Sequence, residues 1–106
     1  YLHGLSAGCP GAVGSTFNFA APLYRRIKAA FKRGAKDAAE LEQARSAQMI
    51  RMFKERDYVP TAKAVMNLAG LDCGPVRPPL TRLSPAQIDT LRRDLDAMGF
   101  FDWAVD

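Results

Sequence analysis

Residues 11–18 read Gly-Ala-Val-Gly-Ser-Thr-Phe-Asn, and this stretch decides which fold we expect. Its glycines frame one short apolar step, which runs directly into the hydroxyl residues Ser15 and Thr16. An apolar segment bounded by glycine is typical of a buried strand in a parallel sheet that helices cover. The pattern therefore predicts a strand that carries polar groups at its end.

A single strand cannot pair its own backbone donors and acceptors, so it needs neighbouring strands. The residues after Pro22 read as helix and supply no second strand. The chain also begins at Tyr1, without a methionine and without a helix start signal. We therefore expect it to be the last part of a larger protein, with the partner strands upstream.

Composition bounds the class of protein. The 106 residues are 48% hydrophobic, enough for one modest domain. A net charge of +4 bears on solubility more than on chemistry. Cys9 and Cys73 form no CxxC pair, which disfavours a zinc site and a disulfide framework and favours reduced thiols in the cytoplasm. No apolar run approaches the roughly 20 residues of a membrane span.

Helical periodicity and punctuation by proline and glycine predict a mostly α-helical chain. A basic helix face is the one feature that suggests nucleic acid, but no aromatic residues interleave with its charges, so a solvated face is favoured. The residues of that face are Arg25, Arg26, Lys28, Lys32 and Arg33. The longest expected helix, residues 37–56, starts at a capping box of Asp37 and Glu40 and is apolar on more than one side. That pattern favours an oligomer, and a methionine-rich cofactor or partner groove is the alternative.

Local motifs do not assemble a complete active site. The glycines are spaced GxxGxxG rather than GxGxxG, and Ser15 is outside a GxSxG elbow. The one histidine, His3, has no acidic neighbour in sequence to tune it. We expect no catalytic residue, no metal site and no cofactor within this chain.

Position nevertheless singles out Gly14 and Ser15. In a (β/α)₈ barrel the active site lies at the C-terminal ends of the strands, which is where these two residues would fall. Glycine permits close backbone approach, and a serine hydroxyl both donates and accepts, which suits a polyhydroxylated ligand. The alternative stays open that Ser15, Thr16 and Asn18 only satisfy the turn between strand and helix.

Four segments in register resemble a known family. They are GAVGSTFN, the APLY helix that follows it, YVPTAKAVMNLAGL and GPVRPPL. Their order and spacing are similar to the C-terminal end of the pyruvate-dependent class I aldolases that include dihydrodipicolinate synthase and N-acetylneuraminate lyase. The sequence Gly-Ser-Thr-aromatic-Asn at 14–18 resembles the N-acetylneuraminate lyase branch more than the synthase branch.

The resemblance implies the C-terminal portion of a TIM barrel, with residues 1–34 as its last helix-strand-helix unit and residues 35–106 as a C-terminal helical extension. It implies a homotetramer that cleaves N-acetylneuraminate to N-acetylmannosamine and pyruvate, through a Schiff base on a lysine upstream of this chain. Dihydrodipicolinate synthase activity, or a non-catalytic helical interaction module, is the alternative. Gly14 and Ser15 carry over as contacts to the sugar portion of the substrate, and Tyr58 and Val59 more weakly as residues near the pocket mouth. The chain's own lysines are not expected to take the catalytic role; they are Lys28, Lys32, Lys36, Lys54 and Lys63.

Overall fold

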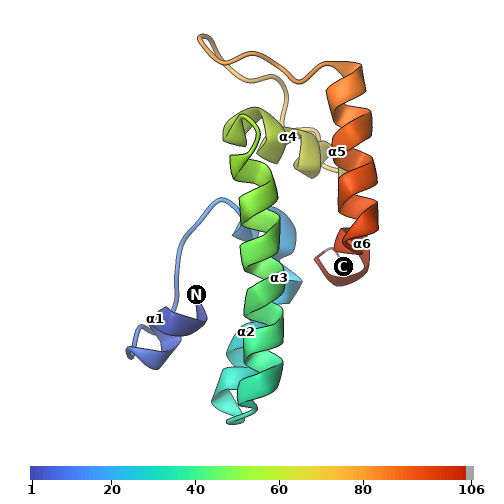
Figure 1. Ribbon diagram of the computed structural model, residues 1–106. Helices are drawn as coiled ribbons and strands as arrows, with labels where there is room; N and C mark the ends of the chain where they lie inside the picture. The colour runs from blue at the N-terminus through green and yellow to red at the C-terminus, as the bar shows by residue number, and fades with distance from the viewer. Residues whose placement is uncertain (105–106) are drawn as a thin grey trace.

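The computed structural model describes residues 1–104, which form helices and no β-strand. The helices are α1 Leu2–Ser6, α2 Phe17–Lys32, α3 Lys36–Lys54, α4 Tyr58–Leu68, α5 Pro85–Ala97 and α6 Phe100–Trp103. The long helices α2 and α3 form an antiparallel hairpin, α4 caps one end of it, and α5 runs back alongside (Figure 1). The expected helical chain is confirmed.

The expected strand is not formed in this chain. Residues 9–14 are irregular, and the side chain of Val13 is fully exposed, at 103% of its reference area. The physical reason is the one that made a lone strand implausible, since the described residues contain no other strand to pair with its backbone. An apolar side chain such as Val13 becomes buried only when other parts of the protein provide a surface that covers it.

Helix α2 begins earlier than the sequence suggests, and its helical geometry is interrupted just before Pro22. It starts at Phe17, yet Ala20 has non-helical angles of φ −133° and ψ 30°, so a second helical segment follows the break. Pro22 lies in the first turn of that segment, where the lack of an N–H costs no hydrogen bond. The chain leaves the helix at Gly34, whose φ of 71° suits glycine.

The start of α3 corrects the sequence interpretation. Asp37 and Glu40 do not form a capping box, because the helix begins at Lys36 and its N-cap is Ala35, which has no side-chain cap. Glu40 instead pairs with Lys36 at 3.8 Å, one turn away along an exposed face. By contrast, a capping box is present at the start of α5, between Ser84 and Gln87.

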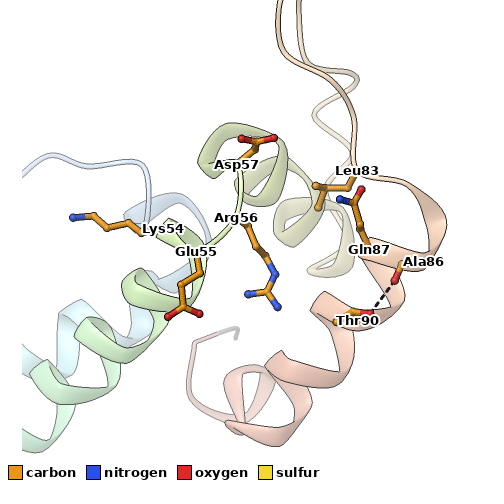
Figure 2. Close-up of a pocket in the computed structure, with 8 residues that line it drawn as sticks. All are labelled: Lys54, Glu55, Arg56, Asp57, Leu83, Ala86, Gln87 and Thr90. Atoms are coloured by element: carbon orange, nitrogen blue, oxygen red, sulfur yellow. Dashed lines mark hydrogen bonds between the residues drawn. The ribbon is translucent and has the colours of Figure 1, made fainter.

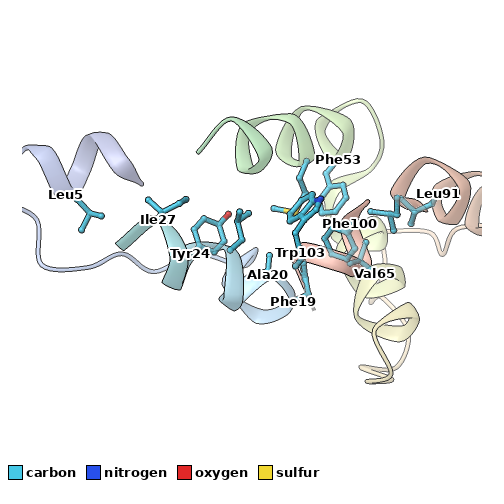
Figure 3. Packing of buried hydrophobic residues seen from close by; sticks show 14 residues of the cluster. Leu5, Phe19, Ala20, Tyr24, Ile27, Phe53, Val65, Leu91, Phe100 and Trp103 are labelled. Carbon is cyan, nitrogen blue, oxygen red and sulfur yellow. The ribbon is translucent and has the colours of Figure 1, made fainter. Parts of the chain in front are cut away.

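One hydrophobic core joins all of the helices. Figure 3 shows its aromatic centre, where Phe53 of α3 and Phe100 of α6 lie beside Phe19 of α2. The fully buried residues of this core are Ala20, Leu23, Ile27, Met49, Phe53, Val65, Leu91, Leu95, Phe100 and Ala104. Arg26 of α2 reinforces it by donating hydrogen bonds to Glu42 of α3 and, at 2.6 Å, to the carbonyl of Trp103. Helix α6 is thereby held to the central hairpin.

The proline-rich segment of residues 71–83 crosses the surface without helix. Lys63 of α4 holds it, because its ammonium group donates to the carbonyls of Cys73 and Pro75 at 2.9 and 3.0 Å. This lysine therefore has a structural contact in the fold.

Candidate functional site

Gly14 and Ser15 lie in an exposed turn that leads into α2. We call residues 14–17 the Ser15 turn. It is closed by a hydrogen bond of 3.1 Å from the amide of Phe17 to the carbonyl of Gly14. A Cβ on Gly14 would lie 3.3 Å from two ring atoms of Phe17, closer than most side-chain contacts. Glycine thus lets the backbone pass closely over this ring.

The Ser15 hydroxyl meets a side chain from a distant part of the sequence. Its Oγ lies 2.6 Å from the hydroxyl oxygen of Tyr58, 43 residues away at the first position of α4. Tyr58 is half-buried, and its ring packs edge-on against Phe53 with centroids 6.3 Å apart. Two hydroxyl groups of different elements are therefore paired on an accessible surface.

The neighbouring residue, Thr16, is anchored in the opposite direction. Its Oγ1 lies 2.7 Å from the hydroxyl oxygen of Tyr24, which is in turn 3.0 Å from Oγ of Ser46. We call this buried chain of Thr16, Tyr24 and Ser46 the hydroxyl relay. Because it ties the Ser15 turn to both α2 and α3, the backbone beside Ser15 is fixed by buried hydrogen bonds.

Aromatic rings line the inner side of the turn. Phe17 stacks on Tyr24 with centroids 4.0 Å apart, and Tyr1 packs edge-on against both rings at 5.7 and 5.8 Å. Their packing leaves Gly14 and Ser15 on the outer side of the turn, where both are exposed. The turn thus presents a bare backbone and a hydroxyl on a rigid support.

A hollow in the described surface lies elsewhere. It is an open groove of about 690 Å³ between the α3–α4 connection and the start of α5, and Figure 2 shows its lining residues. Lys54, Glu55, Arg56 and Asp57 bring two charges of each sign to it. Arg56 is already engaged by Asp94 of α5 and by the carbonyl of Met52. We assign no site to this groove, because its charges balance and it excludes both Gly14 and Ser15.

Other candidate groups are accounted for within residues 1–104. No group of three or more metal-ligating side chains gathers there, and Cys9 and Cys73 are exposed free thiols. Lys28 donates to the carbonyl of Pro10, so it too has a structural contact. No helix among these residues is long and apolar enough to cross a membrane.

Tyr58 and Val59 were expected near the mouth of the substrate pocket only because of the family resemblance. The structure brings Tyr58 onto Ser15 and leaves Val59 exposed, at 45%. The pairing of the two hydroxyls was missed, and so was the hydroxyl relay. No local pattern signals either, since each joins residues that are distant in sequence.

Comparison with known proteins extends these observations. Residues 1–98 match the model of the dihydrodipicolinate synthetase family. A 4-hydroxy-tetrahydrodipicolinate synthase of Acidothermus cellulolyticus is 35% identical over 94% of this chain, and an N-acetylneuraminate lyase of Lactiplantibacillus plantarum is 37% identical over 79%. The chain covers 32% and 29% of these relatives, respectively.

A solved structure also matches this chain over part of its own length. The N-acetylneuraminate lyase of Proteus mirabilis, a TIM barrel, superposes with a TM-score of 0.84 and 34% identity. The match covers 92% of this chain and 33% of the barrel, so the chain spans about a third of the proteins it matches. The predicted fold class, a C-terminal portion of such a barrel that is itself mostly helical, is confirmed. On the match over residues 1–98, this chain belongs to the dihydrodipicolinate synthetase family.

Proposed function

We propose that the chain completes a pyruvate-dependent class I aldolase whose remaining strands and catalytic groups lie in other parts of the full-length protein. In this proposal residues 1–34 close the barrel and residues 35–106 are its helical extension. The family match over residues 1–98 supports the class of enzyme. The good superposition on a barrel lyase supports the placement.

The proposed reaction is the cleavage of N-acetylneuraminate to N-acetylmannosamine and pyruvate. A lysine outside this chain forms a Schiff base with the keto carbon of the substrate. The electron pair of the broken carbon–carbon bond passes toward that Schiff base, while the hydroxyl group on the leaving carbon loses its proton and that carbon becomes the aldehyde. The enamine left on the lysine takes up a proton, and hydrolysis of the Schiff base releases pyruvate. Because a protein lysine supplies the electron sink, the reaction needs no cofactor.

Gly14 and Ser15 are proposed to contact the sugar portion. The observation that carries this role is the geometry of the Ser15 turn, an exposed hydroxyl beside a residue without a side chain, on a backbone anchored by the hydroxyl relay. A rigid donor and acceptor of this kind binds a hydroxylated ligand at little entropic cost. No lysine of this chain is proposed to react.

A synthase activity is the second candidate. The Acidothermus cellulolyticus synthase matches a larger share of this chain, 94%, than the Lactiplantibacillus plantarum lyase, 79%. Both candidates use the same pyruvate chemistry and differ in the aldehyde partner. A homotetramer in the cytoplasm is proposed for either, and the exposed Leu41 of α3, at 57%, offers apolar surface for contact with other parts of the assembly.

The test uses the full-length protein. Borohydride treatment in the presence of pyruvate should leave a covalent adduct detectable by mass spectrometry, and treatment without pyruvate is the control. Release of pyruvate from N-acetylneuraminate, coupled to lactate dehydrogenase, then separates the two candidates, because only the lyase cleaves this substrate. Absence of any pyruvate adduct would overturn the proposed class.

A further inference from the structure

Tyr58 supplies a polar group at the Ser15 turn that the fold does not require. A hydrogen bond on an accessible surface exchanges with water and adds little to stability. The turn is already held by its own backbone bonds and by the hydroxyl relay on its buried side. Nevertheless, α4 begins at the residue whose hydroxyl reaches Ser15 at 2.6 Å.

Proton counting shows what this contact does to Ser15. Each hydroxyl has one proton to donate and lone pairs that accept. The phenol is the stronger acid of the two, so the favoured arrangement has the Tyr58 hydroxyl donating to Ser15 Oγ. The proton of Ser15 then remains free for a third group, and donation into its oxygen strengthens it as a donor.

The ring of Tyr58 is held independently of its hydroxyl. It packs edge-on against Phe53, a fully buried residue of α3. Ser15 is held from the other side by the anchored Thr16. Both hydroxyls therefore keep their relative position without a ligand, which is the arrangement expected of a preorganised contact.

We propose that Tyr58 is a positioning residue that orients the Ser15 hydroxyl as a donor toward the polyhydroxylated half of the substrate, the half that leaves as the aldehyde. This inference rests on the proposed function and adds to it the residue that sets the direction of the Ser15 proton. In this proposal the pyruvate half of the substrate does not contact Ser15 or Tyr58. Loss of the Tyr58 hydroxyl should thus weaken binding of the hydroxylated half and leave Schiff base formation with pyruvate intact.

The experiment compares Tyr58→Phe with wild type in the full-length protein. Removing the hydroxyl while keeping the ring should raise KM for N-acetylneuraminate about fivefold to tenfold, the effect of one lost hydrogen bond, with a smaller change in kcat. Borohydride trapping with pyruvate should be unchanged. Thr90→Val is the control, because it removes an exposed hydroxyl of α5 that lies outside the Ser15 turn, and it should leave KM within about twofold of wild type.

A double-mutant cycle separates positioning from simple packing. If Tyr58 acts through Ser15, then Tyr58→Phe should have little further effect on KM in a Ser15→Ala background. An equal effect in both backgrounds, or an unchanged KM in the single variant, would overturn the inference. So would a protein that traps pyruvate but does not cleave N-acetylneuraminate. Failure to trap pyruvate at all would instead refute the proposed function, so the two failures are distinguishable.

Discussion

Replacing Tyr24 by phenylalanine tests whether the hydroxyl relay anchors the Ser15 turn. The substitution keeps the ring, and with it the stack of 4.0 Å on Phe17. It removes only the oxygen that bridges Thr16 Oγ1 at 2.7 Å and Ser46 Oγ at 3.0 Å. Any loss of stability then reports on hydrogen bonding rather than on lost volume.

The burial of these hydroxyls sets the size of the expected loss in the free energy of unfolding. Ser46 is 1% exposed and Thr16 7%, so water cannot readily replace the missing oxygen. A buried polar group left without a partner costs about 1–3 kcal/mol. Ser46 lies inside α3 and recovers part of this cost by turning toward the carbonyl one turn earlier. We therefore expect Tyr24→Phe to lower the free energy of unfolding by about 2 kcal/mol.

Urea unfolding followed by circular dichroism measures this change, and a double variant tests its cause. Ser46→Ala alone should cost about 1 kcal/mol, the value of one hydrogen bond. In the Tyr24→Phe background the same substitution removes an orphaned hydroxyl, so it should cost nothing further or restore some stability. Additive losses in the double variant, or a loss below about 0.5 kcal/mol in Tyr24→Phe, would refute the reasoning.

Two further predictions concern the turn and the last long helix. Gly14→Ala should destabilise the protein by about 1 kcal/mol and raise KM for the hydroxylated substrate, because the new Cβ would press on the ring of Phe17, which is stacked on Tyr24 and cannot move away. Urea unfolding measures the first effect and steady-state kinetics the second. Wild-type values for both would contradict the close contact. Ser84→Ala should lower the free energy of unfolding by about 1 kcal/mol, because it removes the side chain that accepts a hydrogen bond from the Gln87 amide, while Ser84→Asp should retain most of the stability. Thermal unfolding compares the variants. Equal melting temperatures for Ser84→Ala and wild type would show that Ser84 does not cap the helix.

The sequence predicted the helices well because their signals are local. Pro22 marks the segment after the break in α2, and Ser84 with Gln87 marks the start of α5. The strand expected around Val13 failed for a non-local reason, since it needs partners that residues 1–104 do not contain. The capping box at Asp37 failed because spacing alone does not place a cap, and the N-cap of α3 is Ala35, two residues earlier.

The site was predictable only in part. Gly14 and Ser15 were singled out by their place after an expected strand, and the structure shows them exposed together in one turn. Their contacts were not predictable, because Ser15 and Tyr58 are 43 residues apart and become neighbours only when α4 caps the α2–α3 hairpin. Pairing of hydroxyls leaves no periodic trace in a sequence.

The contacts around Ser15 bear on how this edge of the barrel is assembled. Thr16 is held through Tyr24 of α2 and Ser46 of α3, and Tyr58 is held against Phe53 of α3, so the helices of this chain support both members of the pair. The strand expected before Gly14, by contrast, depends on neighbours that these residues do not provide. Within residues 1–104, the proposed sugar-binding edge is therefore supported by helix packing. Substitutions in the α2–α3 hairpin should therefore reach substrate affinity through the Ser15 turn without altering the chemistry at the Schiff base.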